Sequence, residues 1–307
     1  MKQHVFDIAG FRVGLWLPGE WDADGLLPSF RPFRCKGTEG GKLTLEMRVN
    51  GENLPDTFPQ GELLEEMEND MGHVRLYVLP EGYRVDISSP RGEKVHTMIA
   101  ERCFSRAEVK LCDTEPDKGY VLTSLLRIAF SQAILREKAV SVHASAVYGN
   151  GKAYLFMGKS GTGKSTHSAL WMSCFEEFDL LNDDNPVIRM QQGKVWVYGT
   201  PWSGKTPCYK NIGMPVGGAI RLKQAPFNRF LQKKDANAFI ILLPACSVIH
   251  KDVYLNGLLC DLLAQMAEGI PVGLLECLPN KEAAWLCRKE IENVENREKL
   301  DYREKLN

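Results

Sequence analysis

Two segments of the chain match the pattern G-x-x-x-x-G-K-[ST], which is typical of loops that bind phosphate groups. The first match runs from Gly158 to Ser165, and the second runs from Gly199 to Thr206. In such a loop the glycines let backbone N–H groups approach phosphate oxygens, and the lysine adds a positive charge. The final hydroxyl can coordinate Mg²⁺, and a helix that begins at the loop points its N-terminus, with roughly +0.5 charge, at the anion. Either segment could therefore bind a nucleoside triphosphate together with Mg²⁺.

Neighbouring segments favour the first match as the nucleotide site. It follows an apolar run, Ala153–Met157, that predicts a strand, and it opens into a predicted helix at Lys164–Phe175. Strand, loop and helix in this order form the context in which the pattern binds phosphate. We therefore predict that the nucleotide contacts the following residues: Gly158, Lys159, Ser160, Gly161, Thr162, Gly163, Lys164, Ser165 and Thr166.

The second match has a less suitable context. Pro201 and Trp202 stiffen and crowd the loop, and the segment after it, residues 207–215, has no helical periodicity. We interpret Gly199–Thr206 as a connecting loop or as a loop that reaches the active site. In the second case Lys205 is the residue to test, as a cation that faces phosphate or substrate.

An acidic pair follows the first match. Asp183 and Asp184 come directly after a predicted strand at Phe178–Leu181, and Asp183 lies 19 residues beyond Lys164 (183 − 164). Adjacent aspartates usually form a turn or cap a helix, but this position after a phosphate loop and a strand favours a functional role. One carboxylate could hold Mg²⁺ with the Ser165 hydroxyl, and the other could accept a proton from an attacking hydroxyl. The residues leave open which aspartate has which role.

A histidine is expected near the same loop. His143 lies within Val140–Tyr148, a predicted strand, and Asn150-Gly151 then separates this strand from the next apolar run. Asn-Gly between two apolar runs is a strong signal for a β-hairpin, so the strand that enters the loop should pair antiparallel with the strand that carries His143. His143 could then lie beside the phosphates, or it could be a hydrogen-bonded structural histidine. His167, early on the predicted helix, is expected to be structural.

The remaining elements suggest two parts. Residues 1–116 are predicted to be rich in β structure, with an alternating strand at Lys42–Val49 and a hairpin around Pro80-Glu81-Gly82. Residues 117–307 are predicted to form the catalytic domain, which begins with a helix from Tyr120 to Lys138. The other predicted strands are Lys94–Ile99, Ala107–Cys112, Pro186–Met190, Lys194–Tyr198, Gly218–Leu222 and Val272–Cys277, and the other predicted helices are Asp252–Glu268 and the segment from Lys281 onward.

Composition excludes some classes of protein. The 307 residues are 44% hydrophobic and 25% charged, which is typical of a globular protein with room for two domains. The net charge of −1 gives no support for binding nucleic acid or an anionic membrane. Nine scattered cysteines without a C-x-x-C spacing favour reduced, mostly buried thiols over a zinc or disulfide framework. The longest apolar stretch, Ala238–Ile249, contains Pro244 and is too short to span a bilayer, and the N-terminus lacks a signal-peptide pattern, so we expect a cytoplasmic protein.

Three segments together resemble a known family. They are His143-Ala-Ser-Ala-Val, Gly158–Thr166 and Leu181-Asn-Asp-Asp-Asn-Pro-Val-Ile-Arg189, and they are similar to the catalytic domain of HPr kinase/phosphorylase and its relatives. The resemblance, which extends roughly from Val140 to Val272, implies an α/β (α+β) class with the mixed β-sheet of the phosphoenolpyruvate-carboxykinase-like nucleotide-binding fold. It also implies ATP, a divalent metal ion such as Mg²⁺, and transfer of the terminal phosphoryl group to a hydroxyl. It further implies that a homo-oligomer is possible.

The same resemblance suggests roles for single residues. It implies that Gly158–Thr166, with Lys164, bind the nucleotide, that Asp183 and Asp184 bind metal and act as base, and that His143 lies near the site. The chain departs from the family because it has no glycine- and arginine-rich loop like the one through which HPr kinase engages its protein substrate. This difference favours an acceptor other than HPr, and a small molecule, as for free-serine kinases, is one candidate.

We therefore expect an ATP- and Mg²⁺-dependent phosphotransferase that acts on a hydroxyl of a small molecule or protein. Two alternatives remain open. One is a nucleotide-binding sensor or scaffold that has lost transfer activity. The other is a phosphate-loop ATPase coupled to a partner, with the N-terminal β region as its docking surface.

Overall fold

The computed structural model describes residues 1–307 except 36–40, 53, 55–56, 70, 90–93 and 305–307. The chain divides into two compact units. The first contains Met1–Glu137 and Ile249–Asn256, and the second contains Lys138–Val248 and Gly257–Asn307. The sequence placed a boundary at residues 116/117, before the helix of the catalytic part, whereas this division assigns that helix to the first unit. All predicted site residues belong to the second unit.

The first unit is built on an eight-stranded sheet in the order β1-β2-β3-β8-β7-β6-β5-β4. Its strands are β1 (Lys2–Ile8), β2 (Phe11–Leu17), β3 (Leu45–Val49), β4 (Glu62–Asn69), β5 (Gly72–Leu79), β6 (Gly82–Ser88), β7 (Val95–Glu101) and β8 (Arg106–Lys110). The pairs β2–β3 and β3–β8 are parallel, and the other pairs are antiparallel. The predicted strands near β3 and β5–β8 are confirmed, whereas β1, β2 and β4 were not predicted.

Helices complete the first unit. They are α1 (Ala23–Leu26), η1 (Pro28–Phe33), α2 (Lys118–Ala133) and η2 (Ile134–Glu137). Helix α2 confirms the predicted periodicity, because its apolar positions, such as Leu122, Leu125 and Ala129, are fully buried. It contacts β3 and β7, so its apolar face covers the sheet of this unit.

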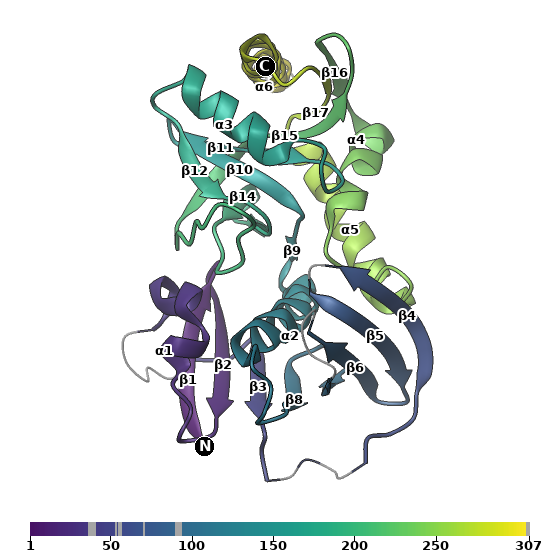
Figure 1. Cartoon of the computed structure of the whole chain (residues 1–307). Coiled ribbons are helices and arrows are strands. Elements are labelled where there is room, and N and C mark those ends of the chain that lie inside the picture. The colour runs from purple at the N-terminus through teal and green to yellow at the C-terminus, as the bar shows by residue number, and fades with distance from the viewer. Residues whose placement is uncertain (36–40, 53, 55–56, 70, 90–93, 305–307) are drawn as a thin grey trace. The chain divides into compact units, whose positions relative to one another are not determined.

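The second unit contains a nine-stranded mixed sheet (Figure 1). Its main path runs β12-β10-β11-β15-β14-β13-β9, and β17 pairs with both β15 and β16. The strands are β9 (Ala139–Ser141), β10 (Ala144–Gly149), β11 (Lys152–Met157), β12 (Asp179–Asn182), β13 (Val187–Gln191), β14 (Lys194–Tyr198), β15 (Gly213–Gln224), β16 (Arg229–Lys233) and β17 (Val272–Cys277). Among the described strands of this unit, β11–β15 and β15–β17 pair parallel and the other pairs are antiparallel, so the sheet is mixed, as predicted.

Strand β15 joins the two parts of this sheet. Its first residues, Gly213–Pro215, pair with β14, and the rest pairs with β11 on one side and with β17 on the other. The helices of the unit are α3 (Lys164–Cys174), α4 (Asp235–Leu242), η3 (Leu243–Ala245) and α6 (Lys281–Glu304), while α5 (Val253–Gly269) begins in the first unit and continues in the second.

An aromatic cluster holds α3 against the sheet. Trp171 is fully buried, and its ring centroid lies 5.2 Å from those of both Tyr154 and Phe156 on β11. Phe175 and Phe178 complete the cluster from the end of the helix and the connection to β12. Replacement of a large buried aromatic residue by alanine typically lowers the free energy of unfolding by about 3–5 kcal/mol. The loop between β11 and α3 is therefore fixed at both ends.

All nine cysteines are free, and Cys208, Cys246 and Cys287 are buried. Within the described residues, no helix combines the length and the apolar character that crossing a membrane requires.

Candidate functional site

The strand that enters the phosphate loop is positioned by a tight hairpin. Strands β10 and β11 pair antiparallel, and Gly149 lies opposite Lys152, so Asn150 and Gly151 alone form the turn. Their φ angles of 51° and 75° are those of a type I′ turn, which Asn-Gly favours because both residues tolerate positive φ. The predicted antiparallel hairpin is confirmed, and it fixes the start of the loop at Gly158.

The loop itself is shaped by glycines and by one short-range contact. Gly161 and Gly163 have φ angles of 78° and 103°, which other residues rarely adopt. The Thr162 backbone N–H and side-chain hydroxyl both donate to the Lys159 carbonyl, at 3.1 and 2.7 Å. Helix α3 begins at Lys164, and no side chain of the described residues caps its N-terminus. Its first N–H groups can therefore bind an anion at this end.

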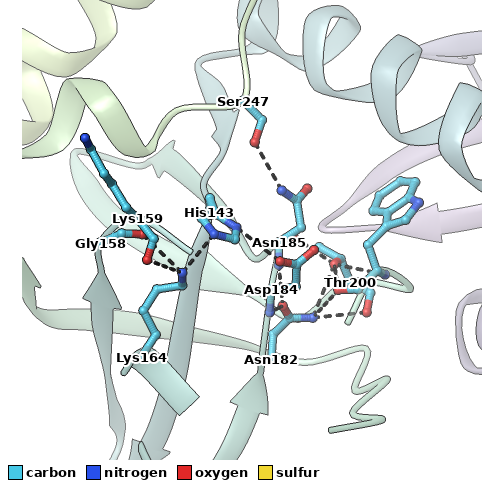
Figure 2. Close-up of polar contacts among 10 residues, drawn as sticks. His143, Gly158, Lys159, Lys164, Asn182, Asp184, Asn185, Thr200 and Ser247 are labelled. Atoms are coloured by element: carbon cyan, nitrogen blue, oxygen red, sulfur yellow. Dashed lines mark hydrogen bonds and ion pairs between the residues drawn. The ribbon is translucent and has the colours of Figure 1, made fainter. Parts of the chain in front are cut away.

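The Lys164 side chain folds back over the loop. Its Nζ lies 2.8 Å from Nε2 of His143 and donates to the carbonyls of Gly158 and Lys159 at 3.1 and 3.4 Å (Figure 2). Lys164 is only 8% exposed. Burial lowers the pKa of its ammonium group, while the negative charges of Asp184 and Asp183 act in the opposite direction. The lysine is thus positioned between the loop and the acidic pair.

His143 connects Lys164 to the acidic pair. Its Nδ1 lies 3.1 Å from Oδ1 of Asp184, and its Nε2 faces Lys164 (Figure 2). A lysine ammonium can only donate, so Nε2 accepts and the Nδ1 proton points to Asp184. This arrangement brings together three residues that the sequence proposed as site residues, from three separate segments of the chain.

One prediction about His143 was wrong. The segment Val140–Tyr148 is not one strand, because it divides into β9 and β10 at this residue. The backbone N–H of Val142 donates to Pro186, and that of His143 donates to Ala245, at 3.0 and 2.7 Å. These bonds replace ladder bonds and leave the imidazole at a break in the sheet rather than within a strand.

Asn182 organises the turn that carries the acidic pair. Its Oδ1 accepts the N–H groups of Asp184 and Asn185 at 3.1 and 2.8 Å. Its Nδ2 donates to the Trp202 carbonyl at 2.9 Å, and the Thr200 hydroxyl donates to the Asn185 carbonyl at 2.8 Å (Figure 2). The sequence reasoning overlooked Asn182 and Thr200. The pattern of Asn before Asp-Asp, typical of a side-chain-stabilised turn, could have indicated the first of them.

Asp183 is the most unusual residue of this group. It is 5% exposed, and within the described part of the chain neither carboxylate oxygen has a hydrogen-bond partner. A buried carboxylate without partners is energetically costly and requires a compensating cation or donor. Its oxygens therefore fit a divalent metal ion, which prefers oxygen ligands.

A metal ion would need further ligands. In the described part of the chain, no group of three or more His, Cys, Asp or Glu side chains is arranged to hold a metal. Ser165, the predicted Mg²⁺ ligand of the loop, is exposed in the first turn of α3. This donor set fits Mg²⁺ that is completed by phosphate oxygens and water, rather than a closed protein site.

The second G-x-x-x-x-G-K-T segment lies against the acidic pair. A Cβ added to Gly204 would come within 2.8 Å of the Asp183 carbonyl oxygen, so only glycine fits here without movement. Lys205 follows at once and is exposed. No helix follows the loop, as predicted, and of the two interpretations the contact with Asp183 supports a loop that reaches the site.

Comparisons with known proteins give a limited result. No family model matches the chain, and no curated protein matches it. Among solved structures, one match is the HPr(Ser) kinase/phosphatase from Coxiella burnetii, with 13% sequence identity and a TM-score of 0.31, over 54% of this chain and 94% of that one. A likeness of this size carries no functional argument, so the function must be argued from the geometry of the site.

Proposed function

We propose that this chain is an ATP- and Mg²⁺-dependent phosphotransferase that transfers the terminal phosphoryl group to a hydroxyl acceptor. The observation that carries the proposal is the line of contacts from Lys164 through His143 to Asp184, next to the buried carboxylate of Asp183, which has no hydrogen-bond partner among the described residues. A phosphate loop with a lysine, a carboxylate that can hold Mg²⁺ and a group that can act as a base are recurring parts of sites for phosphoryl transfer.

The phosphates would bind to the loop at Gly158–Ser165. The N-terminus of α3 presents backbone N–H groups to the phosphates. Lys164 supplies a positive charge, and its ammonium group donates to two loop carbonyls and to the imidazole of His143 in this structure. Phosphate oxygens are stronger acceptors than these groups, so the ammonium group would move to them. The proposed fold is the phosphoenolpyruvate-carboxykinase-like one, because β11 pairs antiparallel with β10 and parallel with β15, unlike the parallel sheet of ordinary phosphate-loop NTPases.

Asp183 and Ser165 would hold the Mg²⁺ ion. Bound there, the ion supplies positive charge to the transferring phosphoryl group and the leaving phosphates. Asp183 suits this role because its oxygens are buried and have no hydrogen-bond partner in the described part of the chain, while Oδ1 of Asp184 already contacts His143.

Asp184 and His143 would handle the proton of the acceptor hydroxyl. The Asp184 carboxylate accepts a hydrogen bond from the Nδ1–H group of His143. In this tautomer Nε2 carries the lone pair. Once Lys164 has moved to the phosphates, Nε2 can accept a proton, or Asp184 can accept it directly. General-base catalysis of this kind contributes typically 10²–10⁴-fold to a rate.

The acceptor would bind on the side of the loop Gly199–Thr206. This loop is tied to the acidic pair through Asn182, and Lys205 is exposed beside it. An exposed ammonium group at this place suits an acceptor with a carboxylate or phosphate group.

The direct test is transfer from γ-labelled ATP with Mg²⁺ to a panel of hydroxyl metabolites and to whole-cell extract. A labelled acceptor that disappears with Lys164→Ala and with Asp183→Asn is the expected result. Unchanged turnover in Lys164→Ala would end the proposal. ATP binding without any labelled acceptor would instead favour a sensor or scaffold, and slow hydrolysis accelerated by a partner would favour an ATPase.

A further inference from the structure

A cavity of about 600 Å³ lies beside the phosphate loop in the second unit. Three segments form its walls: the loop with the first turns of α3, the end of β15, and the end of β17 with the residues after it. The residues that matter here are Thr166, Leu170, Leu222, Gln224, Cys277 and Pro279.

The cavity and the proposed reaction site use different sides of the same loop. Gly161, Thr162 and Gly163 line the cavity, whereas Lys164, His143 and the acidic pair do not. Thr166 and Leu170 are one helical turn apart and therefore lie on one face of α3, which is turned to the cavity. A phosphate chain in the loop would thus have its reacting end near Lys164 and its other end at the mouth of the cavity.

The walls have the chemistry of a site for a flat, mostly apolar group. Leu170, Leu222 and Pro279 supply apolar surface, and Gln224 supplies a carboxamide that carries both a donor and an acceptor. The Gln224 amide donates to the Gly161 carbonyl at 3.2 Å, so it is held at the loop. Apolar walls with a few placed polar groups are typical of small-molecule sites, and the volume lies within the usual range of about 300–1,000 Å³.

A buried polar atom adds to this argument. His167 borders the cavity and is 3% exposed, and within the described residues its Nε2 has no hydrogen-bond partner. A buried imidazole nitrogen that has no partner among the described residues can form a hydrogen bond with a ligand hydroxyl or ring nitrogen in the cavity.

We infer that this cavity binds the nucleoside part of the nucleotide, with the base between the apolar walls and the ribose toward Thr166. The inference rests on the proposed function, because it assumes that phosphates occupy the loop. The acceptor is excluded from this place by position, since it must reach the outer phosphate beside Lys164, and that residue does not line the cavity.

The test compares ATP with inorganic tripolyphosphate, which carries the phosphates without a nucleoside. Leu170→Trp fills the cavity from α3, so the Kd for ATP should rise about tenfold or more while the Kd for tripolyphosphate stays unchanged. Lys164→Ala should weaken both ligands. Equal ATP affinity in wild type and Leu170→Trp would overturn the inference while leaving the phosphate site intact.

A second measurement uses the wild-type protein and is independent of how any variant folds. Cys277 lines the cavity and Cys174 does not, and both are partly exposed. ATP should slow alkylation of Cys277, as followed by mass spectrometry, and tripolyphosphate should not, with Cys174 as the internal control. Equal protection by both ligands, or by neither, would contradict nucleoside binding here. If wild type bound neither ligand, the proposed function itself would fail.

Discussion

The buried carboxylate of Asp183 leads to an unusual prediction. The substitution Asp183→Asn should remove activity and should also stabilise the ligand-free protein. Asp183 is 5% exposed, and within the described residues its oxygens have no hydrogen-bond partner. A buried, unpaired charge costs several kcal/mol, and the nearby Lys164 ammonium offsets part of this. Because a carboxamide has nearly the same shape and no charge, Asp183→Asn should raise the free energy of unfolding by about 1–3 kcal/mol.

Urea unfolding in EDTA measures this difference, and Asp184→Asn is the matched control. Asp184 pairs with His143 at 3.1 Å, so its replacement should change stability by about 0–1 kcal/mol in the destabilising direction. Addition of Mg²⁺ and ATP at 100 times Kd should stabilise wild type by about 2.7 kcal/mol, and Asp183→Asn by much less. If Asp183→Asn were less stable than wild type in EDTA, the carboxylate would be satisfied in the free protein and the argument for a metal ligand would fail.

Further predictions concern four other residues. Lys164→Ala should lower phosphoryl transfer by about 10²–10³-fold with an unchanged circular dichroism spectrum, because a charge on the outer phosphates is lost. Asn182→Ala should lower the free energy of unfolding by about 2–3 kcal/mol in urea titrations, since the acidic turn loses its acceptor and the bond to Trp202. Burial lowers the pKa of His167 to about 4, so the unfolded chain binds more protons than the folded chain between pH 4 and 6.5. The free energy of unfolding should therefore rise with pH in that window by up to about 3 kcal/mol. His167→Phe should abolish this rise. Lys205→Ala should raise the KM for the acceptor in steady-state kinetics and leave the Kd for ATP unchanged, and an equal effect on both would contradict its place on the acceptor side.

Local chemistry explains what the sequence predicted well. Asn150-Gly151 specified a two-residue turn, because both residues adopt positive φ readily, and the antiparallel pairing of β10 with β11 followed from it. In the structure, Gln192 and Gly193 likewise have positive φ between the antiparallel strands β13 and β14. The helix after the loop and the strand before the acidic pair also have clear patterns, so the residues around the loop could be found without a structure.

What the sequence missed depends on contacts between distant segments. The break at His143 arises because Val142 and His143 bond to Pro186 and Ala245, which no local pattern reveals. The role of Asn182 requires the approach of residues 200–202, and Gly204 of the same loop lies close to the Asp183 backbone. Short elements such as α4 and β16 were also missed, because a brief apolar segment fits a helix and a strand equally well.

The long strand β15 connects two parts of the second unit that the proposed function uses, the loop that begins at Gly199 and the cavity beside the phosphate loop. Near its start, the Ile212 carbonyl accepts the N–H of Gly199, where the acceptor-side loop begins, and at its end Gln224 lines the cavity. A strand of 12 residues spans roughly 35–40 Å, and partners along its length keep it from bending freely. Because side chains alternate between faces, gain or loss of one residue in β15 would turn Gln224 away from the cavity as well as change the span. Under the proposed function, β15 therefore holds the segment that begins at Gly199 and the wall of the cavity at Gln224 in fixed positions within one sheet.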